Sequence, residues 1–135
     1  MATRFTFGKK EKLKSRKRID DLFRSGKSIS MFPIRTSYQL EASSGPGLVQ
    51  AGVTVSKRNF RHAADRNRIK RLLREAYRLQ KAGLLQAAAQ KEQNVFVFLM
   101  YTNKTILPFE AIQEAVRKTL KKLENALDEK HEKTS

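Results

Sequence analysis

The order of helical and extended patterns in this chain predicts an α/β (α+β) sandwich, one small sheet with helices packed mainly on one face. Three stretches carry most of this prediction. Residues 49–56 alternate apolar side chains with small or polar ones, as a half-buried strand does. Residues 94–101 are apolar on both faces, which is typical of a strand buried inside a sheet. Residues 109–127 repeat apolar side chains at steps of three and four, the spacing of an amphipathic helix.

The N-terminal part is expected to form an arm and a short helix. Residues 1–14 are basic and mostly aperiodic, so we expect an arm that lies across the domain. Residues 15–24 have the period of a short helix. The apolar side chains of this helix share one face, at Ile19, Leu22 and Phe23. Gly26 is expected to end the helix in the left-handed conformation that glycine adopts easily.

Extended structure is expected next. Residues 28–40 are rich in β-forming side chains and are interrupted by Pro33, which indicates two short strands or one bent strand. Residues 43–47 have the serines, glycines and proline of a turn. In the strand that follows, one face carries small or polar side chains, which leave a surface on which another molecule could lie.

Two helices are expected in the second half of the chain. The first runs from about Ala63 to Lys81, with Gly83 as its stop or as a kink and residues 84–90 adding further turns. Pro108 suits the first turn of the last helix.

The length of the chain, 135 residues, suffices for one domain with a real core but not for two ordinary domains. The apolar stripe of the last helix ends at Leu127, so residues 128–135 are expected to form a frayed tail. We therefore predict a basic arm over residues 1–14, a single domain over residues 15–127, and that tail.

The composition excludes several classes of function. Cysteine is absent, which rules out disulfides, thiolate nucleophiles and cysteine-based zinc sites. The two histidines, His62 and His131, are far apart and cannot make a metal site alone. No apolar stretch has the length of a membrane span, and the N-terminus lacks the apolar core of a secretory signal. A cytoplasmic protein is expected.

The charge of the chain points to a polyanionic partner. Lys and Arg number 29 and Asp and Glu 13, which gives a net charge of +16, far above what solubility requires. The clustering of these cations, and their high Arg content, favour nucleic acid as the partner.

The cations are concentrated between residues 57 and 74, where Asp65 is the one acid. They are Lys57, Arg58, Arg61, Arg66, Arg68, Lys70, Arg71 and Arg74. Apolar residues fall at helical spacing within this run, so one stripe can pack on a core while the cations stay outside. Like charges one turn apart repel each other in the free protein, and a phosphate backbone would remove that repulsion.

This basic segment and the strand before it closely resemble the signature of the protein subunit of bacterial ribonuclease P. The matching residues are Val53-Thr54-Val55-Ser56-Lys57-Arg58, then Ala63 or Ala64, then Arg66-Asn67-Arg68-Ile69-Lys70-Arg71-Leu72-Leu73-Arg74-Glu75-Ala76-Tyr77-Arg78. Phe7 and Lys12-Leu13 resemble that family's N-terminal arm, and residues 19–26 its first helix and cap. The resemblance covers roughly residues 5–127, and its specific part is the Arg-Asn-Arg-x-x-Lys-Arg core in a strand–loop–helix context.

The resemblance implies the element order αβββαβα, in the fold shared with domain 2 of ribosomal protein S5. It also implies a left-handed βαβ crossover, an exception to the right-handed rule. The implied activity is endonucleolytic removal of the 5′ leader from precursor tRNA. Catalysis would belong to the RNA subunit, with Mg²⁺ held mainly by RNA, and the protein alone would be inactive. The implied partners are the ribonuclease P RNA and precursor tRNA, with neither a membrane nor DNA.

Carried over residue by residue, the resemblance predicts an RNA-binding surface on the basic helix and the loop before it. Its members are Lys57, Arg58, Arg61, Arg66, Asn67, Arg68, Lys70, Arg71 and Arg74. Arginine forks can hold phosphates bidentately, and Asn67 can bond a phosphate, a 2′-hydroxyl or its own backbone. Two alternatives stay open: Asn67 could cap a helix start, and Arg74 and Arg78 could be ordinary solvated surface.

The resemblance also implies that a cleft between the first helix and the sheet receives the single-stranded leader. Single strands bind through a basic groove and aromatic platforms. The candidates are Phe7, Arg16, Ile19, Phe23 and Tyr38. Ile19 stands where many family members have an aromatic side chain. On the strand, Ser37 matches by ungapped count and Tyr38 by residue type, and we favour Tyr38. Phe7 and Phe23 could equally be core residues, and Arg16 could lie on a solvated face.

Two other classes of protein are weighed against this one. A ribosomal or assembly protein would bind structured RNA without serving an enzyme, and composition alone does not separate the two. A DNA-binding helix-turn-helix protein is disfavoured, because the basic helix follows a strand and no partner helix precedes it. No Ser/His/Asp group, Gly-rich phosphate loop or acidic cluster suited to Mg²⁺ is visible, so no catalytic and no metal-ligating residue is predicted.

Overall fold

The computed structural model describes residues 11–134, and the side chains of residues 11–129. Four helices and four strands form an α+β fold in this part of the chain. In chain order they are α1 (Arg16–Ser25), β1 (Lys27–Met31), β2 (Ile34–Ala42), β3 (Val49–Val55), α2 (Ala63–Gln80), α3 (Ala82–Lys91), β4 (Gln93–Tyr101) and α4 (Phe109–Thr134). This is the expected order, with one helix, α3, added after the basic helix.

The strands form one mixed sheet in the order β1-β2-β4-β3. β4 is central, since it pairs antiparallel with β2 and parallel with β3. Its side chains alternate between buried and half-buried along its whole length. The prediction of a strand buried inside the sheet is therefore confirmed. The interruption at Pro33 separates two antiparallel strands, β1 and β2, rather than bending one.

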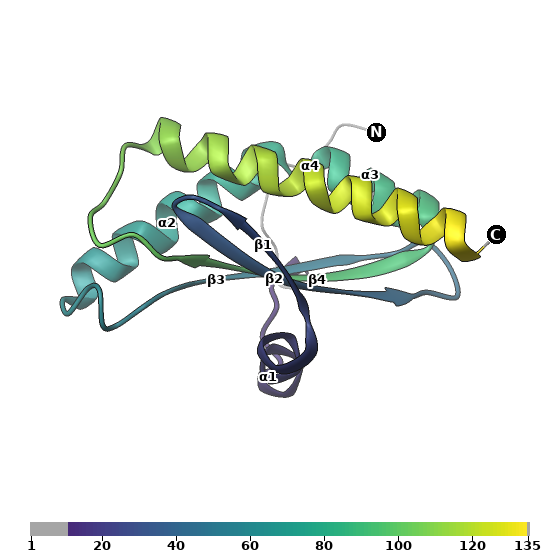
Figure 1. The fold of residues 1–135 in the computed structure, drawn as a ribbon, viewed down its shortest axis with the longest axis horizontal. Coiled ribbons are helices and arrows are strands. Elements are labelled where there is room, and N and C mark those ends of the chain that lie inside the picture. Colours follow the sequence, from purple (N-terminus) through teal and green to yellow (C-terminus); the bar gives the residue numbers. More distant parts are fainter. Residues whose placement is uncertain (1–10, 135) are drawn as a thin grey trace.

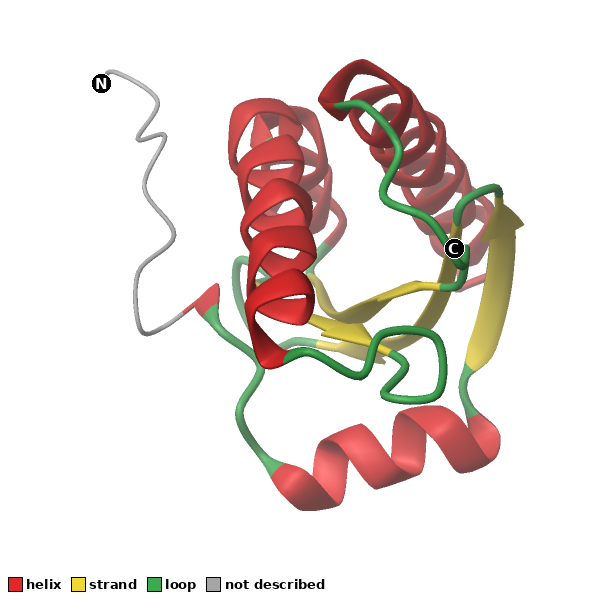
Figure 2. Ribbon diagram, turned by 90° about the vertical axis from the view of Figure 1, so that its left-hand side faces the viewer, coloured by secondary structure: helices red, strands yellow, loops and turns green. Residues whose placement is uncertain are grey.

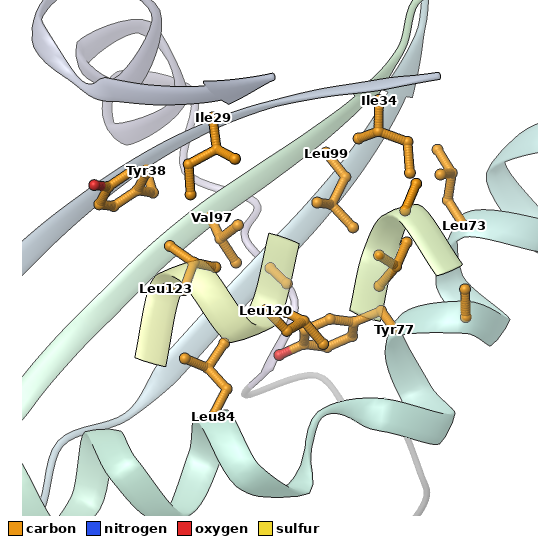
Figure 3. Close-up of a cluster of buried hydrophobic side chains, with 14 of the residues drawn as sticks. Ile29, Ile34, Tyr38, Leu73, Tyr77, Leu84, Val97, Leu99, Leu120 and Leu123 are labelled. Carbon is orange, nitrogen blue, oxygen red and sulfur yellow. The ribbon is translucent and has the colours of Figure 1, made fainter. Parts of the chain in front are cut away.

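Three helices cover one face of the sheet, and the remaining helix lies across the other. α2, α3 and α4 lie together on one side, and α1 lies alone on the opposite side (Figures 1 and 2). Figure 3 shows Val97 and Leu99 of β4 facing Leu120 and Leu123 of α4, beside Tyr77 of α2. Each of these side chains is at most 2% exposed, and burying one of them stabilises the fold by about 1.5–3 kcal/mol.

The end of α1 differs from the sequence-based expectation. Gly26 has a φ of −73°, so the predicted left-handed conformation is wrong. Glycine is required there for a different reason, because a Cβ atom would lie 2.5 Å from the carbonyl oxygen of Leu22. The N-terminus of α1 is capped by Ser15, whose hydroxyl accepts a hydrogen bond from the backbone N–H of Arg18.

Two later helix boundaries also differ. α2 ends before Lys81, and Gly83 lies inside a separate helix, α3. α4 continues to Thr134, beyond Leu127, where its apolar stripe ends, and fraying of this helix end stays a prediction. The segment after Leu127 is rich in Glu and Lys, which favour helix without any need for an apolar stripe.

Residues 11–14, the described part of the expected arm, run beside β3. The backbone N–H of Leu13 donates a hydrogen bond to the carbonyl of Ala51 at 2.9 Å, and the Leu13 side chain is 5% exposed. We call residues 11–14 the arm segment. Its bridge at Ala51 covers part of the sheet edge that β3 would otherwise leave open.

Candidate nucleic-acid interface

The basic helix α2 has one buried and one exposed face. Its buried residues are Ile69, Leu73, Ala76 and Tyr77, each 0% exposed. Its exposed polar residues are Asn67, Arg68, Arg71 and Arg74. Because a helix repeats every 3.6 residues, these four side chains follow one strip of the helix surface, opposite the core. We call them the α2 strip.

The cations of the α2 strip are not neutralised by the protein's own acids. Within the described residues, none of Arg68, Arg71 and Arg74 belongs to an ion pair. Arg78, one turn further on, does: its guanidinium lies 2.5 Å from the Glu75 carboxylate. The hydrogen bond from Arg78 lowers the pKa of the Glu75 carboxyl. The uncompensated charge therefore ends at Arg74.

Arg66 has a different role from the α2 strip. Its Nη1 donates to the carbonyl oxygens of Phe60 and Arg61, at 2.8 and 2.7 Å. The side chain thus turns back onto the loop before α2. That loop is also anchored by Phe60, which is 8% exposed and packs on the ring of Tyr101. Arg66 fixes the loop as well as carrying charge.

The loop before α2 holds three exposed cations, Lys57, Arg58 and Arg61. The Ser56 hydroxyl accepts a hydrogen bond from the backbone N–H of Arg58, at 3.2 Å. Asn59 donates to the carbonyl of Thr102, at 3.2 Å, and so ties the loop to the end of β4. The three cations lie beside the N-terminus of α2, whose dipole also favours an anion.

Two predicted members of the helix surface, Asn67 and Lys70, have different positions relative to the α2 strip. The structure places Asn67 in the second turn of α2, exposed, and the helix is capped at His62, so Asn67 is not a capping residue. Lys70 is half-buried, at the border of the strip.

A groove lies on the face of the sheet that α1 crosses. It has a volume of about 360 Å³. Its lining comes from the arm segment, α1, β3, β4 and α2, at Lys12, Leu13, Lys14, Ile19, Ala51, Gly52, Val53, Arg74 and Phe98. We call it the α1 groove. Arg74 belongs both to this lining and to the α2 strip.

The floor of the α1 groove depends on a close contact between β3 and β4. Gly52 pairs with Phe98 across the two strands. A Cβ atom at position 52 would lie 2.6 Å from Cε2 of Phe98, so the missing side chain makes room for the ring. The ring of Phe23 meets Phe98 edge-on, with centroids 5.6 Å apart. Phe23 is nevertheless 50% exposed, so part of its surface is available to a ligand.

The predicted leader-cleft residues divide into three groups. Ile19 lines the α1 groove and Phe23 packs on its floor. Arg16 is exposed on α1 but is not among the side chains that line the groove. Phe7 lies outside the described residues.

The preference for Tyr38 over Ser37 as a cleft residue is wrong. Tyr38 is 8% exposed and pairs with Val97, on the face of the sheet that α4 covers (Figure 3). Ser37 pairs with Phe98 and therefore shares the face of the α1 groove. The Tyr38 side chain instead borders a separate hollow of about 500 Å³, between β2 and the end of α4. Burial, together with the Glu129 carboxylate, raises the pKa of Tyr38.

Two contributions to this face of the sheet, from β4 and from Arg18, were not predicted from the sequence. Residues 94–101 were predicted to be a strand buried inside the sheet, but alternate residues of a strand face opposite sides, and Phe98 lines the α1 groove. Arg18 lies 4.0 Å over the ring of Phe96 and forms an ion pair with Glu41 at 2.9 Å. It also donates to Gln39. Arg18 therefore holds α1 against the sheet.

No helix in the described chain combines the length and the apolar character needed to cross a membrane. Within the described residues, no three or more His, Cys, Asp or Glu side chains come together in a way that could hold a metal ion.

Known proteins share both the sequence pattern and the fold. The family model described as ribonuclease P matches residues 7–124. The ribonuclease P protein component of Porphyromonas gingivalis is 34% identical over 122 residues, 89% of this chain and 89% of that protein. That of Chlorobium phaeobacteroides is 44% identical over 79 residues, 56% of this chain and 54% of that protein.

Solved structures agree on the fold. The RNase P protein from Thermotoga maritima superposes with a TM-score of 0.64 at 20% identity, over 83% of this chain and 96% of that chain. The Staphylococcus aureus RNase P protein gives a TM-score of 0.59 at 20% identity, over 82% of this chain and 93% of that chain. The resemblance inferred from the basic segment is therefore confirmed, and the chain belongs to the ribonuclease P family.

Proposed function

We propose that this protein is the subunit that assists the catalytic RNA of ribonuclease P in removing the 5′ leader from precursor tRNA. The α2 strip and the cations of the loop before it would contact phosphates of the RNA subunit. The α1 groove would receive the single-stranded leader. We expect the protein to act in the cytoplasm, together with its RNA partner.

The observation that carries this proposal is the position of Arg74. Arg74 is the last cation of the α2 strip in chain order, before the ion-paired Arg78, and its side chain also lines the α1 groove. A folded RNA on the strip and a single strand in the groove would therefore meet on one continuous basic surface. Phosphates of two RNA molecules repel each other, and cations placed between them reduce that repulsion.

The groove has what a single strand requires. Lys12, Lys14 and Arg74 supply positive charge on its walls, and Phe98 with the half-exposed Phe23 supplies aromatic surface. Stacking on such surfaces is worth about 1–3 kcal/mol per base and tolerates any sequence. A leader of variable sequence suits this chemistry.

The groups of the described residues offer no site for the metal that would assist the chemical step. The described residues hold no acidic cluster that fits Mg²⁺, so we propose that RNA phosphates hold the metal. Mg²⁺ there would activate the attacking water and stabilise the leaving oxygen. The role left to this chain is to bind and orient the two RNAs, and the isolated protein is expected to cleave nothing.

Reconstitution tests the proposal. The protein is combined with a bacterial ribonuclease P RNA at low Mg²⁺, where cations from the protein matter most, and 5′ processing of precursor tRNA is measured. We expect processing well above that of the RNA alone, and none from pure protein with Mg²⁺. An unchanged rate would contradict the assisting role, and leader release by pure protein would contradict the assignment of catalysis to RNA.

A further inference from the structure

The junction of α2 and α3 contains a buried charge that the proposed function does not use. Lys81 is 1% exposed, the lowest value for a charged side chain among the described residues. Its Nζ lies 2.6 Å from Oε1 of Glu11, a residue 70 positions away whose side chain is 23% exposed. Burial of an ammonium group costs several kcal/mol unless it is paired and hydrogen-bonded. The buried Lys81 ammonium therefore favours a Glu11 carboxylate that stays beside it.

Lys81 is held in place by the two helices that it joins. It lies between the two helices, and its carbonyl accepts a hydrogen bond from the N–H of Leu85 at 3.0 Å. Burial, together with the nearby Glu11 carboxylate, raises the pKa of the Tyr77 phenol on the buried face of α2. One end of the arm segment is thus held by the helical layer.

The other end of the arm segment is held by the sheet. The backbone N–H of Leu13 bonds to the carbonyl of Ala51, and the Leu13 side chain is buried. Lys12 lies between these two attachments, and Lys14 directly follows the second. Both lysines are exposed, and both line the α1 groove. Exposed lysine side chains on a free arm would take many positions, and binding would cost the entropy of fixing them. Attachment of the arm before binding reduces this entropic cost.

We propose that Lys81 is a positioning residue for single-stranded RNA. Its ion pair with Glu11 holds the arm segment against β3, and so keeps Lys12 and Lys14 as one wall of the α1 groove. This inference rests on the proposed function in one respect, namely that the groove receives the leader. The attachment of the arm segment itself does not depend on it.

The first measurement is independent of RNA. Lys81→Met removes the ammonium and keeps an unbranched apolar side chain, and the Glu11 carboxylate can turn to water. Hydrogen exchange at the Leu13 amide then reports whether the arm segment stays on β3. We expect its protection to fall on the order of tenfold, while amides in the core of β4 stay protected.

Lys91→Met is the matched control. Lys91 is the last residue of α3 and also forms an ion pair, with Asp128 at 3.2 Å, but that pair joins α3 to α4. The change in net charge is the same, and Leu13 should keep its protection. Equal protection of Leu13 in the Lys81→Met protein and in this control would overturn the proposal.

The second measurement uses the holoenzyme reconstituted with a bacterial ribonuclease P RNA. The ratio of affinities for precursor and mature tRNA isolates the leader's contribution. We expect this ratio to fall roughly three- to tenfold in Lys81→Met, as for the loss of one or two charged contacts. Affinity for the RNA subunit should be unchanged, whereas general damage to the fold would lower both.

Each other outcome has a definite meaning. Release of Leu13 with an unchanged ratio would overturn the role of the arm segment as a groove wall. No preference for precursor in the unmodified holoenzyme would instead refute leader binding by the groove, with the Leu13 result standing separately. Should Lys81→Met fail to fold, Glu11→Gln/Lys81→Met removes both charges, leaves neither unpaired, and carries the same expectations.

Discussion

The cations of the basic segment differ in what their head groups contact. Arg66 donates to two carbonyls of the loop before α2, and Arg78 is paired with Glu75. Arg68, Arg71 and Arg74 are exposed and belong to no ion pair within the described chain. A phosphate binds most favourably where no carboxylate must first be displaced. The α2 strip is therefore where substitution should affect RNA binding and not folding.

Arg68→Ala is expected to weaken binding of the RNA subunit by about tenfold, or about 1.5 kcal/mol, because one charge-assisted contact to a phosphate is lost. Filter binding at fixed salt measures this, and the circular-dichroism spectrum and the melting temperature should not change. Arg117→Ala is the control, because it removes an exposed arginine that α4 already pairs with Glu114. Equal losses in both variants, or an unfolded Arg68→Ala protein, would contradict a specific contact.

At the scale of elements, the turn between β2 and β3 is fastened to the junction of α3 and β4. The N–H of Ser43 donates to the carbonyl of Glu92, and the N–H of Val95 donates to that of Leu48. The side chain of Asn94 accepts from the N–H of Leu48 at 3.0 Å. This places β3 beside the start of β4 and so sets the floor of the α1 groove.

Two glycines of this turn should respond very differently to alanine. At Gly47 a Cβ atom would lie 1.9 Å from the carbonyl oxygen of Gln93 and 2.4 Å from that of Ala88, and neither backbone atom can move cheaply. We expect Gly47→Ala to lower the free energy of unfolding by about 3 kcal/mol. Urea denaturation measures the difference.

The control lies two residues earlier. A Cβ atom at Gly45 would meet nothing within 4 Å. Gly45→Ala should therefore change the free energy of unfolding by no more than about 0.5 kcal/mol. Similar values for the two variants would show that the packing of this turn is not as described.

At the scale of the whole molecule, the net charge of +16 is not balanced where RNA is proposed to bind. The ion pairs of the described chain lie elsewhere: they attach α1 to β2, the arm segment to α2–α3, and α3 to α4, or lie within α2 and α4. The acids in these ion pairs thus hold parts of the fold together, and none of them pairs with a cation of the α2 strip.

Binding of the RNA subunit should consequently depend steeply on salt. Neutralising roughly six to ten phosphates implies a loss of ~10³–10⁵ in affinity between about 50 and 200 mM salt, because bound counterions are released on association. Fluorescence anisotropy with labelled RNA measures the slope. Circular dichroism over the same range should show an unchanged fold. A nearly flat response would exclude phosphate contact as the main source of affinity.

Much of the fold followed from the sequence because periodicity is a local property. The alternation in β3 and the stripes of α2 and α4 each indicate which face is buried, and the stripe of α2 placed the α2 strip outside. The apolar β4 indicates only a strand that is buried inside the sheet. The same rule could have placed Tyr38 correctly. Ile34, Thr36, Tyr38 and Leu40 alternate with polar residues, and the structure puts all four on the covered face, with the first three buried and Leu40 half-buried. Tyr38 was preferred over Ser37 because of its residue type, whereas the alternation would have placed Ser37 on the face of the α1 groove.

The chain's order of residues was thus sufficient for the class of fold, the basic helix and the family, since these depend on spacing and composition along one segment at a time. It was not sufficient for the contacts that complete the groove. Gly52 against Phe98, Arg18 over Phe96, and Lys81 with Glu11 each join segments distant in sequence. Only the folded chain brings such pairs together, because whether a lysine is solvated or buried against a carboxylate depends on neighbours that no local pattern specifies.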